Sequence, residues 1–309
     1  MSTTRRAMDA LAVQLMLLLS VIWGLQQISI KLAAPDMAPL LQVGLRSLLA
    51  VPLVVLFMLW RRQPFAWRDG TLRDGLVLGL LFAVEFLCVA EGLRYSSAAH
   101  IVVLLYTAPI FAALGLHLLL PGERLRPLQW LGILLAFAGT LLAFARTLLD
   151  GEASADMLLG DLFGLLSGLF WAALIVWVRC SRLADAPPAK ALLFQLLGAA
   201  ILLPLAALLS GQASTFSLTP TVIWALLFQG VVVAFASYLA WFWLLRQYNA
   251  SQLGAFSFMT PLFGVLFGIG LLGEQVDGLF LAGGLLVLLG ISLVSAHAWW
   301  RRLLLSRAG

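Results

Sequence analysis

The chain has 309 residues, of which 62% are hydrophobic and only 11% are charged, and its formal net charge is +5. Water-soluble domains are about half apolar and roughly a quarter charged, so this composition excludes a soluble globular protein. The mean hydropathy of +1.03 predicts that lipid is the main solvent. The apolar runs are continuous and do not alternate at strand length, which excludes a β-barrel.

Ten apolar segments follow one another along the chain, separated by short breaks rich in proline and glycine. A spanning helix needs about 20 apolar residues, and these segments reach that length. The first run follows Arg5 and Arg6 and is too long for the apolar core of a signal peptide, so we expect it to be retained as a helix. We expect helices at about 11–33, 39–60, 71–93, 97–120, 127–145, 158–179, 190–210, 219–245, 251–272 and 277–298.

The distribution of basic residues predicts the orientation. With the N-terminus inside and ten spans, Lys31, Arg94 and Arg146 lie outside and Arg46 lies within a helix. The other 15 of the 19 Lys and Arg residues lie inside. Basic residues mark the cytoplasmic side of membrane proteins, so we predict that both termini are cytoplasmic.

One pattern occurs twice. Thr107, Pro109 and the pair 122–123 (Gly-Glu) recur as Thr260, Pro261 and the pair 273–274, about 151–153 residues later, as the sequence shows. We therefore predict two five-helix repeats, residues 1–148 and 149–309. Because five is odd, the second repeat enters the membrane from the opposite side, as in many secondary transporters. The predicted fold is an all-α integral membrane protein with ten transmembrane helices in two inverted five-helix repeats.

The segment GIGLLG (268–273) has the spacing of a dinucleotide-binding loop. That motif requires a strand before it and a helix after it in a soluble unit. Here it lies inside an apolar helix, so we interpret its glycines as sites of close helix contact.

Several segments together resemble the EamA type of the drug/metabolite transporter superfamily. They are IWGLQQISIKLAAPDMAP (22–39), the run 93–125, QWLGILLAFAGTLL (129–142) and GISLV (290–294). The resemblance covers nearly the whole chain. It implies a ten-helix carrier of the inner membrane that exports amino acids, other metabolites or toxic compounds. It also implies a central cavity lined mainly by helices 1, 3, 4, 6, 8 and 9.

Four polar residues share one level in the outer half of the membrane: Gln26, Gln27, Arg46 and Glu85. Intramembrane polar groups are costly and usually functional. Arg46 and Glu85 are at matching depths, so an ion pair between them is possible. They could neutralise each other structurally, or they could bind the carboxylate and ammonium groups of an amino-acid-like solute. Glu85 could also carry a coupling proton.

Aromatic residues form the second candidate group. Trp23 and Trp171 are repeat mates near the midplane. Tyr238 aligns with Glu85 in the repeat, and Trp241 shares its helix face three residues on. Tyr106, which directly precedes the repeated Thr, completes the set. These residues predict an aromatic-lined cavity, with plain helix packing as the alternative.

Pro109 and Pro261 lie near the midplane at equivalent depths in the two repeats. Proline removes a backbone donor and frees a carbonyl. We interpret both as kinks beside the cavity, with tolerated membrane prolines as the alternative.

Other polar and small residues are predicted to be structural. These are Glu123 and Glu274 as mouth or capping groups, His100 and His117 as packed or hydrogen-bonded groups, and Gly160, Gly164 and Gly168 as a helix-packing face.

These features favour a secondary transporter for a small metabolite, in the lipid bilayer of the inner membrane. There is no Walker A sequence, so ATP hydrolysis by this chain is not expected. No cofactor, metal or nucleic-acid partner is expected, and oligomeric state and proton coupling are left open. Broad multidrug efflux is the main alternative. A membrane-embedded enzyme is a distant one, because the chain has no H-E-x-x-H motif and no paired intramembrane aspartates.

Overall fold

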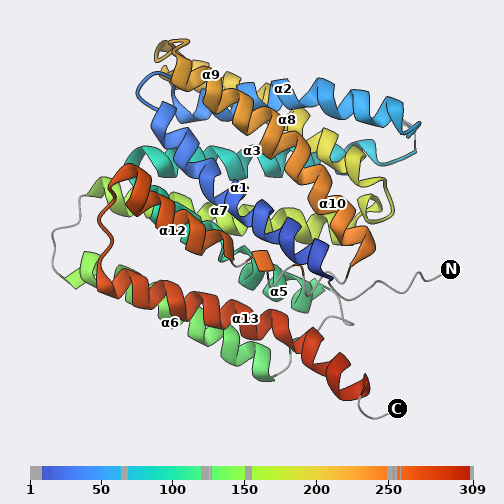
Figure 1. Ribbon diagram of the computed structural model, residues 1–309, viewed down its shortest axis with the longest axis vertical. Helices are drawn as coiled ribbons and strands as arrows, with labels where there is room; N and C mark the ends of the chain where they lie inside the picture. Colours follow the sequence, from blue (N-terminus) through green and yellow to red (C-terminus); the bar gives the residue numbers. More distant parts are fainter. Residues whose placement is uncertain are drawn as a thin grey trace.

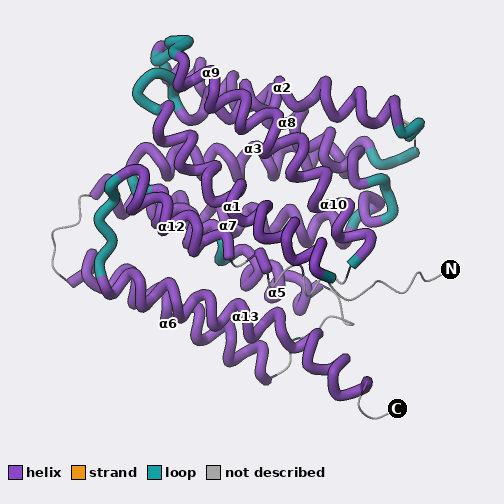
Figure 2. The backbone as a smooth tube through the Cα atoms, in the orientation of Figure 1, coloured by secondary structure: helices purple, strands orange, loops and turns teal. Residues whose placement is uncertain are grey.

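The structure, a computed structural model, describes residues 9–63, 69–119, 125, 127–149, 155–248, 253, 256–257 and 259–306. Within these ranges the chain is helical and contains no β-strand, apart from one isolated bridge between Met37 and Phe216 (Figure 2). The prediction of an all-helical membrane protein is confirmed.

The helices of the first half are α1 (Ala10–Ala33), α2 (Pro39–Trp60), α3 (Leu72–Tyr95), α4 (Ala98–Leu105), α5 (Ala108–Leu119) and α6 (Pro127–Leu149). Those of the second half are α7 (Ala155–Cys180), α8 (Pro188–Leu209), α9 (Pro220–Leu227), η4 (Phe228–Ser237), α10 (Tyr238–Gln247), α12 (Met259–Leu272) and α13 (Gly278–Ser306).

Seven helical stretches of the described chain are long and apolar enough to cross a membrane. They are α1, α2, α3, Ala98–Leu119, α7, α8 and Pro220–Trp241. Three shorter apolar helices cover 127–142, 259–272 and 278–290. The protein is therefore a multi-pass membrane protein, and the count of ten spans stays a prediction.

Local chemistry explains where several helices begin. Asp9 caps α1, its Oδ1 accepting a hydrogen bond from the amide of Ala12 at 2.9 Å. Ser97 caps α4 by accepting from the amide of His100 at 3.0 Å. A proline opens α2, α8 and α9, where its missing amide proton has no partner to lose.

The helices pack in a symmetric pattern, in which each contact between the two halves has a counterpart between the equivalent helices. α2 packs on α8, and α6 packs on α13 along one edge of the bundle (Figure 1). α3 packs on α7 as η4 packs on α1, and α4 packs on α7 as α12 packs on α1. This pattern supports the predicted repeat, whose inversion across the membrane stays a prediction.

The two ends of the bundle carry different connections. α1 begins and α13 ends at the right-hand side of Figure 1, where α7 also turns into α8. We call this the α7–α8 end. At the opposite side lie the turn between α1 and α2, the α3–α4 corner and the α12–α13 loop. We call that the α1–α2 end.

Candidate functional site: a central cavity

A cavity of about 360 Å³ lies in the interior of the bundle. Ligand pockets span about 300–1,000 Å³, so this one suits a small solute. Its lining comes from α1, α3, the α4–α5 turn, α7, α8, α10 and Ser257. Eight of the nine predicted substrate-binding residues line it: Trp23, Gln26, Gln27, Glu85, Tyr106, Trp171, Tyr238 and Trp241.

Glu85 is the only charged side chain among the described residues that line the cavity. It is 5% exposed, and its Oε2 atom has no hydrogen-bond partner. A buried, unpaired carboxylate oxygen is costly and calls for a partner. The side chain is therefore the one acidic group that the described lining presents to the cavity.

Arg46 does not line the cavity but lies directly behind its wall. Its guanidinium is 4.3 Å from the ring centroid of Phe86, and it also interacts with Tyr238. Both of these aromatic residues line the cavity. Arg46 is only 1% exposed, and its Nε and Nη1 atoms have no hydrogen-bond partner.

The described contacts include no direct ion pair between Arg46 and Glu85. The two groups are close enough to attract each other electrostatically. Because each keeps unpaired polar atoms, their charges are not satisfied by mutual contact. In the described contacts, Arg46 and Glu85 are thus two separate groups near one cavity and not a direct ion pair.

Two edge-to-face aromatic pairs form part of the wall. Trp23 meets Trp241 with ring centroids 5.6 Å apart, and Tyr106 meets Trp171 at 5.2 Å. Such pairs add stability beyond the burial of their area. Trp23 and Trp171, the predicted repeat mates, each belong to one pair.

A π-helical segment, η4, positions the part of this wall that α10 contributes. It spans Phe228–Ser237 and leads directly into Tyr238 and Trp241. Ser237 donates to the carbonyl of Val233 at 2.6 Å and accepts from Trp23 Nε1 at 2.9 Å. π-helical turns are rare and frequent at functional sites. This segment holds α10 against α1 at the cavity.

Sequence reasoning missed part of the lining. Ala191 and Gln195 bring α8, the seventh expected helix, into the wall, and Ser257 adds a hydroxyl. Gln195 carried a usable signal, because it is an amide within an apolar span. Ala191 and Ser257 carried none.

The two prolines lie in different local settings. The chain turns at Tyr106 and Thr107, the two residues between α4 and α5, and Pro109 is the second residue of α5. Pro261 lies in α12, near the described start of that helix at Met259. A hinge role for either proline stays a prediction.

The cavity lies on the side of the α7–α8 end. Its lining includes Val178 near the end of α7, Ala191 near the start of α8 and Trp241 in α10. At this end of the bundle Lys190, next to Ala191 in the chain, donates from its Nζ to Asp69 Oδ2 at 2.6 Å. That hydrogen bond, with others from Thr71, holds the pKa of Asp69 well below its usual value.

The described residues contain no cluster of three or more His, Cys, Asp or Glu placed to bind a metal. The site therefore consists of one carboxylate, aromatic rings, amides and apolar side chains, with a guanidinium behind the wall. This arrangement can bind and release a solute.

The model of the EamA-like transporter family matches the chain twice, over residues 10–145 and 158–296. The chain belongs to the EamA-like transporter family. This transporter is 28% identical to an uncharacterized transporter of Archaeoglobus fulgidus, over 91% of its own length and 96% of the relative. It is also 28% identical to a probable amino-acid metabolite efflux pump of Salmonella typhimurium, over 90% and 92%.

A further relative of the transporter is the uncharacterized inner membrane transporter YedA of Escherichia coli, at 27% identity over 87% of this chain and 86% of the relative. A solved crystal structure is similar over 96% of this chain and 99% of its own, with a TM-score of 0.66 and 21% identity. That likeness shows the fold alone.

Proposed function

We propose that this transporter exports small amphipathic metabolites, amino acids above all, by alternating access around the central cavity. Two curated relatives, from Salmonella typhimurium and Escherichia coli, are named probable amino-acid metabolite efflux pumps. The proposal includes an inner-membrane location, cytoplasmic termini and two inverted repeats divided near residue 148.

The observation that carries this proposal is the buried carboxylate of Glu85, whose Oε2 has no hydrogen-bond partner, inside an aromatic and apolar wall. A substrate ammonium group would pair with Glu85, and an apolar side chain would pack on Trp23 and Trp171. Cations also bind well over aromatic faces. Arg46, behind Phe86, is the nearest cationic group for a substrate carboxylate.

The position of the cavity sets the expected direction of loading. The cavity lies toward the α7–α8 end, which the distribution of basic residues predicts to be cytoplasmic. In this conformation the site would load from the cytoplasm, as export requires.

Counterflow in proteoliposomes tests the function. The panel consists of amino acids, nucleobases and cationic dyes, each measured with and without an imposed proton gradient. Selective exchange of amino acids supports the proposal, and the gradient comparison separates coupled from facilitated transport. Exchange of many unrelated dyes would instead support multidrug efflux, which the aromatic walls also allow. No exchange of any amino acid contradicts the proposal.

Glu85→Gln tests the recognition group. The change keeps the side chain's size and removes its charge, so we expect the apparent affinity for an amine substrate to fall about 10–100-fold, as when a charge-assisted hydrogen bond is lost. Glu91→Gln is the matched control, since Glu91 lies on the same helix and pairs with Arg94 at 2.6 Å, away from the cavity. Wild-type kinetics in Glu85→Gln would eliminate Glu85 from substrate binding.

A further inference from the structure

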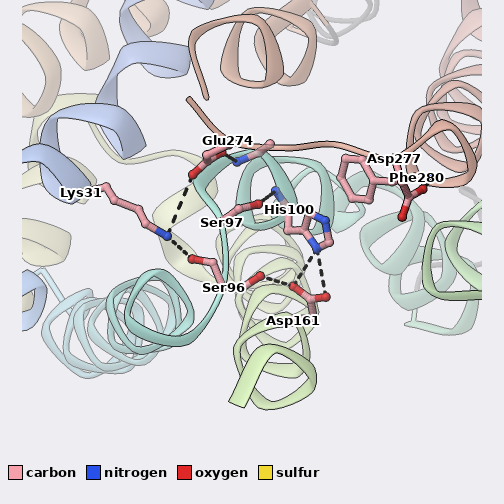
Figure 3. A network of polar contacts seen from close by, with 9 residues as sticks. Lys31, Ser96, Ser97, His100, Asp161, Glu274, Asp277 and Phe280 are labelled. Atoms are coloured by element: carbon pink, nitrogen blue, oxygen red, sulfur yellow. Dashed lines mark hydrogen bonds and ion pairs between the residues drawn. The ribbon is translucent and has the colours of Figure 1, made fainter. Parts of the chain in front are cut away.

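The α1–α2 end contains a network of polar contacts that joins both halves of the chain (Figure 3). It brings together α1, the α3–α4 corner, α7 and the α12–α13 loop. The cavity lies in the interior, toward the other end of the bundle. The network is therefore placed to hold the end away from the cavity closed.

Glu274, from the α12–α13 loop, is the centre of the network. Its two carboxylate oxygens accept from the amides of Ala98 and Ala99, at 2.7 and 3.0 Å. These amides open α4, so the second half of the chain caps a helix of the first half. A carboxylate at a helix N-terminus is stabilised by the helix dipole and by charge-assisted hydrogen bonds.

Lys31 ties α1 to the same point. Its ammonium donates to the carbonyl of Ser96 and lies 3.9 Å from Glu274 Oε1. The predicted capping role of Glu274 is confirmed, although its partner is a helix 176 residues away in the sequence.

His100 and Asp161 form a second layer of the network. His100 Nδ1 lies 3.1 and 3.0 Å from the two carboxylate oxygens of Asp161, which is 0% exposed. Ser96 donates to the same carboxylate. The ring of His100 stacks on Phe280 of α13 with centroids 4.1 Å apart. The predicted hydrogen-bonded role of His100 is confirmed.

α4 connects this network to the cavity. All eight of its residues are buried, and the turn that follows it places Tyr106 in the cavity wall. At about 1.5 Å per residue the helix spans about 12 Å between the two sites. A rigid helix of this length transmits a displacement from one end to the other.

Glycines flank α4 on both sides. A Cβ at Gly164 of α7 would lie 3.1 Å from Leu104, and one at Gly168 would lie 2.9 Å from the carbonyl of Leu104. On the other side, a Cβ at Gly264 of α12 would lie 2.6 Å from Val102. α4 thus lies between two smooth helix faces, which confirms the predicted packing role of the α7 glycines.

We propose that Glu274 bound to the N-terminus of α4 is a latch that keeps the α1–α2 end closed, and that α4 links this latch to the cavity wall at Tyr106. The inference rests on the proposed alternating-access function. Opening the α1–α2 end requires Glu274 to leave the amides of Ala98 and Ala99. A substrate that displaces Tyr106 would move α4 along its glycine faces and weaken that contact.

Thiol accessibility tests the latch. The background carries Cys88→Ala and Cys180→Ser, and Gln26→Cys supplies a reporter in the cavity. A membrane-impermeant methanethiosulfonate is added to intact cells and, separately, to inverted vesicles, without substrate. We expect Glu274→Ala to raise the labelling rate from the face with the α1–α2 end about tenfold, since it removes charge-assisted contacts. Labelling from the opposite face should fall.

Asp277→Ala is the matched control for the latch. Asp277 lies in the same loop and caps α13 by accepting from the amide of Phe280 at 2.7 Å, without touching α4. Equal labelling of Glu274→Ala and Asp277→Ala from both faces overturns the latch. If Glu274→Ala does not fold, Glu274→Gln decides by the same comparison, since it keeps the side chain's size but only one acceptor oxygen.

A third variant tests the link through α4. Trp171→Ala removes the ring that packs on Tyr106, so a smaller rise in labelling from the α1–α2 face is expected. No rise would overturn the link. Because labelling is measured without substrate, its failure is distinguishable from a failure of counterflow, which would contradict the transport proposal instead.

Discussion

The two ends of the bundle are closed by contacts of different kinds. At the α1–α2 end, Asp161 is fully buried and Glu274 binds backbone amides of another helix. At the α7–α8 end, the side chain of Asp69 is 37% exposed where it meets the buried Lys190, so that pair is only half-exposed. Exposed ion pairs contribute about 0–1 kcal/mol, whereas buried ones are costly to break. The end beside the cavity is thus the easier one to open.

Among the described residues, the α7–α8 end also carries hydrogen bonds in exposed positions. Arg182 donates to the carbonyl of Gly70 at 3.4 Å, and its amide donates to Asp74 at 3.2 Å, both in exposed positions. Trp177 adds a hydrogen bond to the carbonyl of Asp74 at 2.9 Å. These contacts can exchange with water when the α7–α8 end opens. Those of the α1–α2 end must be replaced within the protein.

Removing the buried carboxylate should have the largest effect on stability. Asp161→Ala leaves His100 and Ser96 without their shared partner. We expect a loss of about 3–5 kcal/mol in the free energy of unfolding, as for other buried pairs that lose one member. Thermal unfolding in detergent, followed by tryptophan fluorescence, measures it. Asp69→Ala at the other end should change stability far less, and equal losses would show that the two ends are alike.

Filling the space beside Ser96 should have the next largest effect. A Cβ at Gly160 would lie 2.7 Å from both the Cβ and the amide nitrogen of Ser96. Overpacking of this kind costs about 1–3 kcal/mol. Gly270→Ala is the control, because nothing lies within 4 Å of the added Cβ. The same unfolding assay compares the two variants. Equal losses of stability would contradict a tight contact between Gly160 and Ser96.

The Asp69–Lys190 contact predicts a pH dependence that is small and confined to acid. The hydrogen bond from Lys190 lowers the folded-state pKa of Asp69. The contribution of ionised Asp69 to the free energy of unfolding is therefore complete above the ordinary aspartate pKa, about 3.9. It is lost as the pH falls through the lower pKa of the folded state. The difference in Tm between wild type and Asp69→Asn should stay constant from about pH 8 to 5 and shrink below about pH 4. A difference that already shrinks near neutral pH would contradict this assignment.

Cysteine labelling sharpens the comparison without perturbing the fold. Cys180 is exposed at the α7–α8 end, whereas Cys88 is buried. An impermeant maleimide should label wild type in inverted vesicles and not in intact cells, and Cys180→Ser should abolish the signal. Labelling of intact cells would place the α7–α8 end outside and reverse the predicted orientation of the termini.

The sequence located the cavity because polar and aromatic residues at membrane depth are costly or distinctive. The predicted depths grouped Glu85 with Trp23 and Trp171, and all three line the cavity. Depth does not reveal which helix face a residue occupies. The sequence therefore did not predict that Arg46, at the matching level, lies behind Phe86 and not in the wall. The depth of a residue follows from its position along the helix. The face it occupies can be predicted only where the helix has a clear polar stripe.

Contacts between the halves were beyond sequence reasoning. Glu274 was predicted to cap or to lie at a mouth, yet nothing near it in the chain indicates that α4 is its partner. The π-helical winding of η4 also has no local signal, since FQGVVVAFAS contains neither proline nor a run of polar residues. Both features depend on tertiary packing, which can override local preference.

The winding of η4 has a consequence for how the cavity wall can change. A π-helical hydrogen bond closes a wider turn than the 3.6 residues of an α-helix, so this segment holds more chain in each revolution. A return to α-helical winding would rotate Tyr238 and Trp241 about the helix axis and carry them off Trp23. The second half of the chain thus contains a rotary adjustment at the position that α3, a continuous α-helix, occupies in the first half.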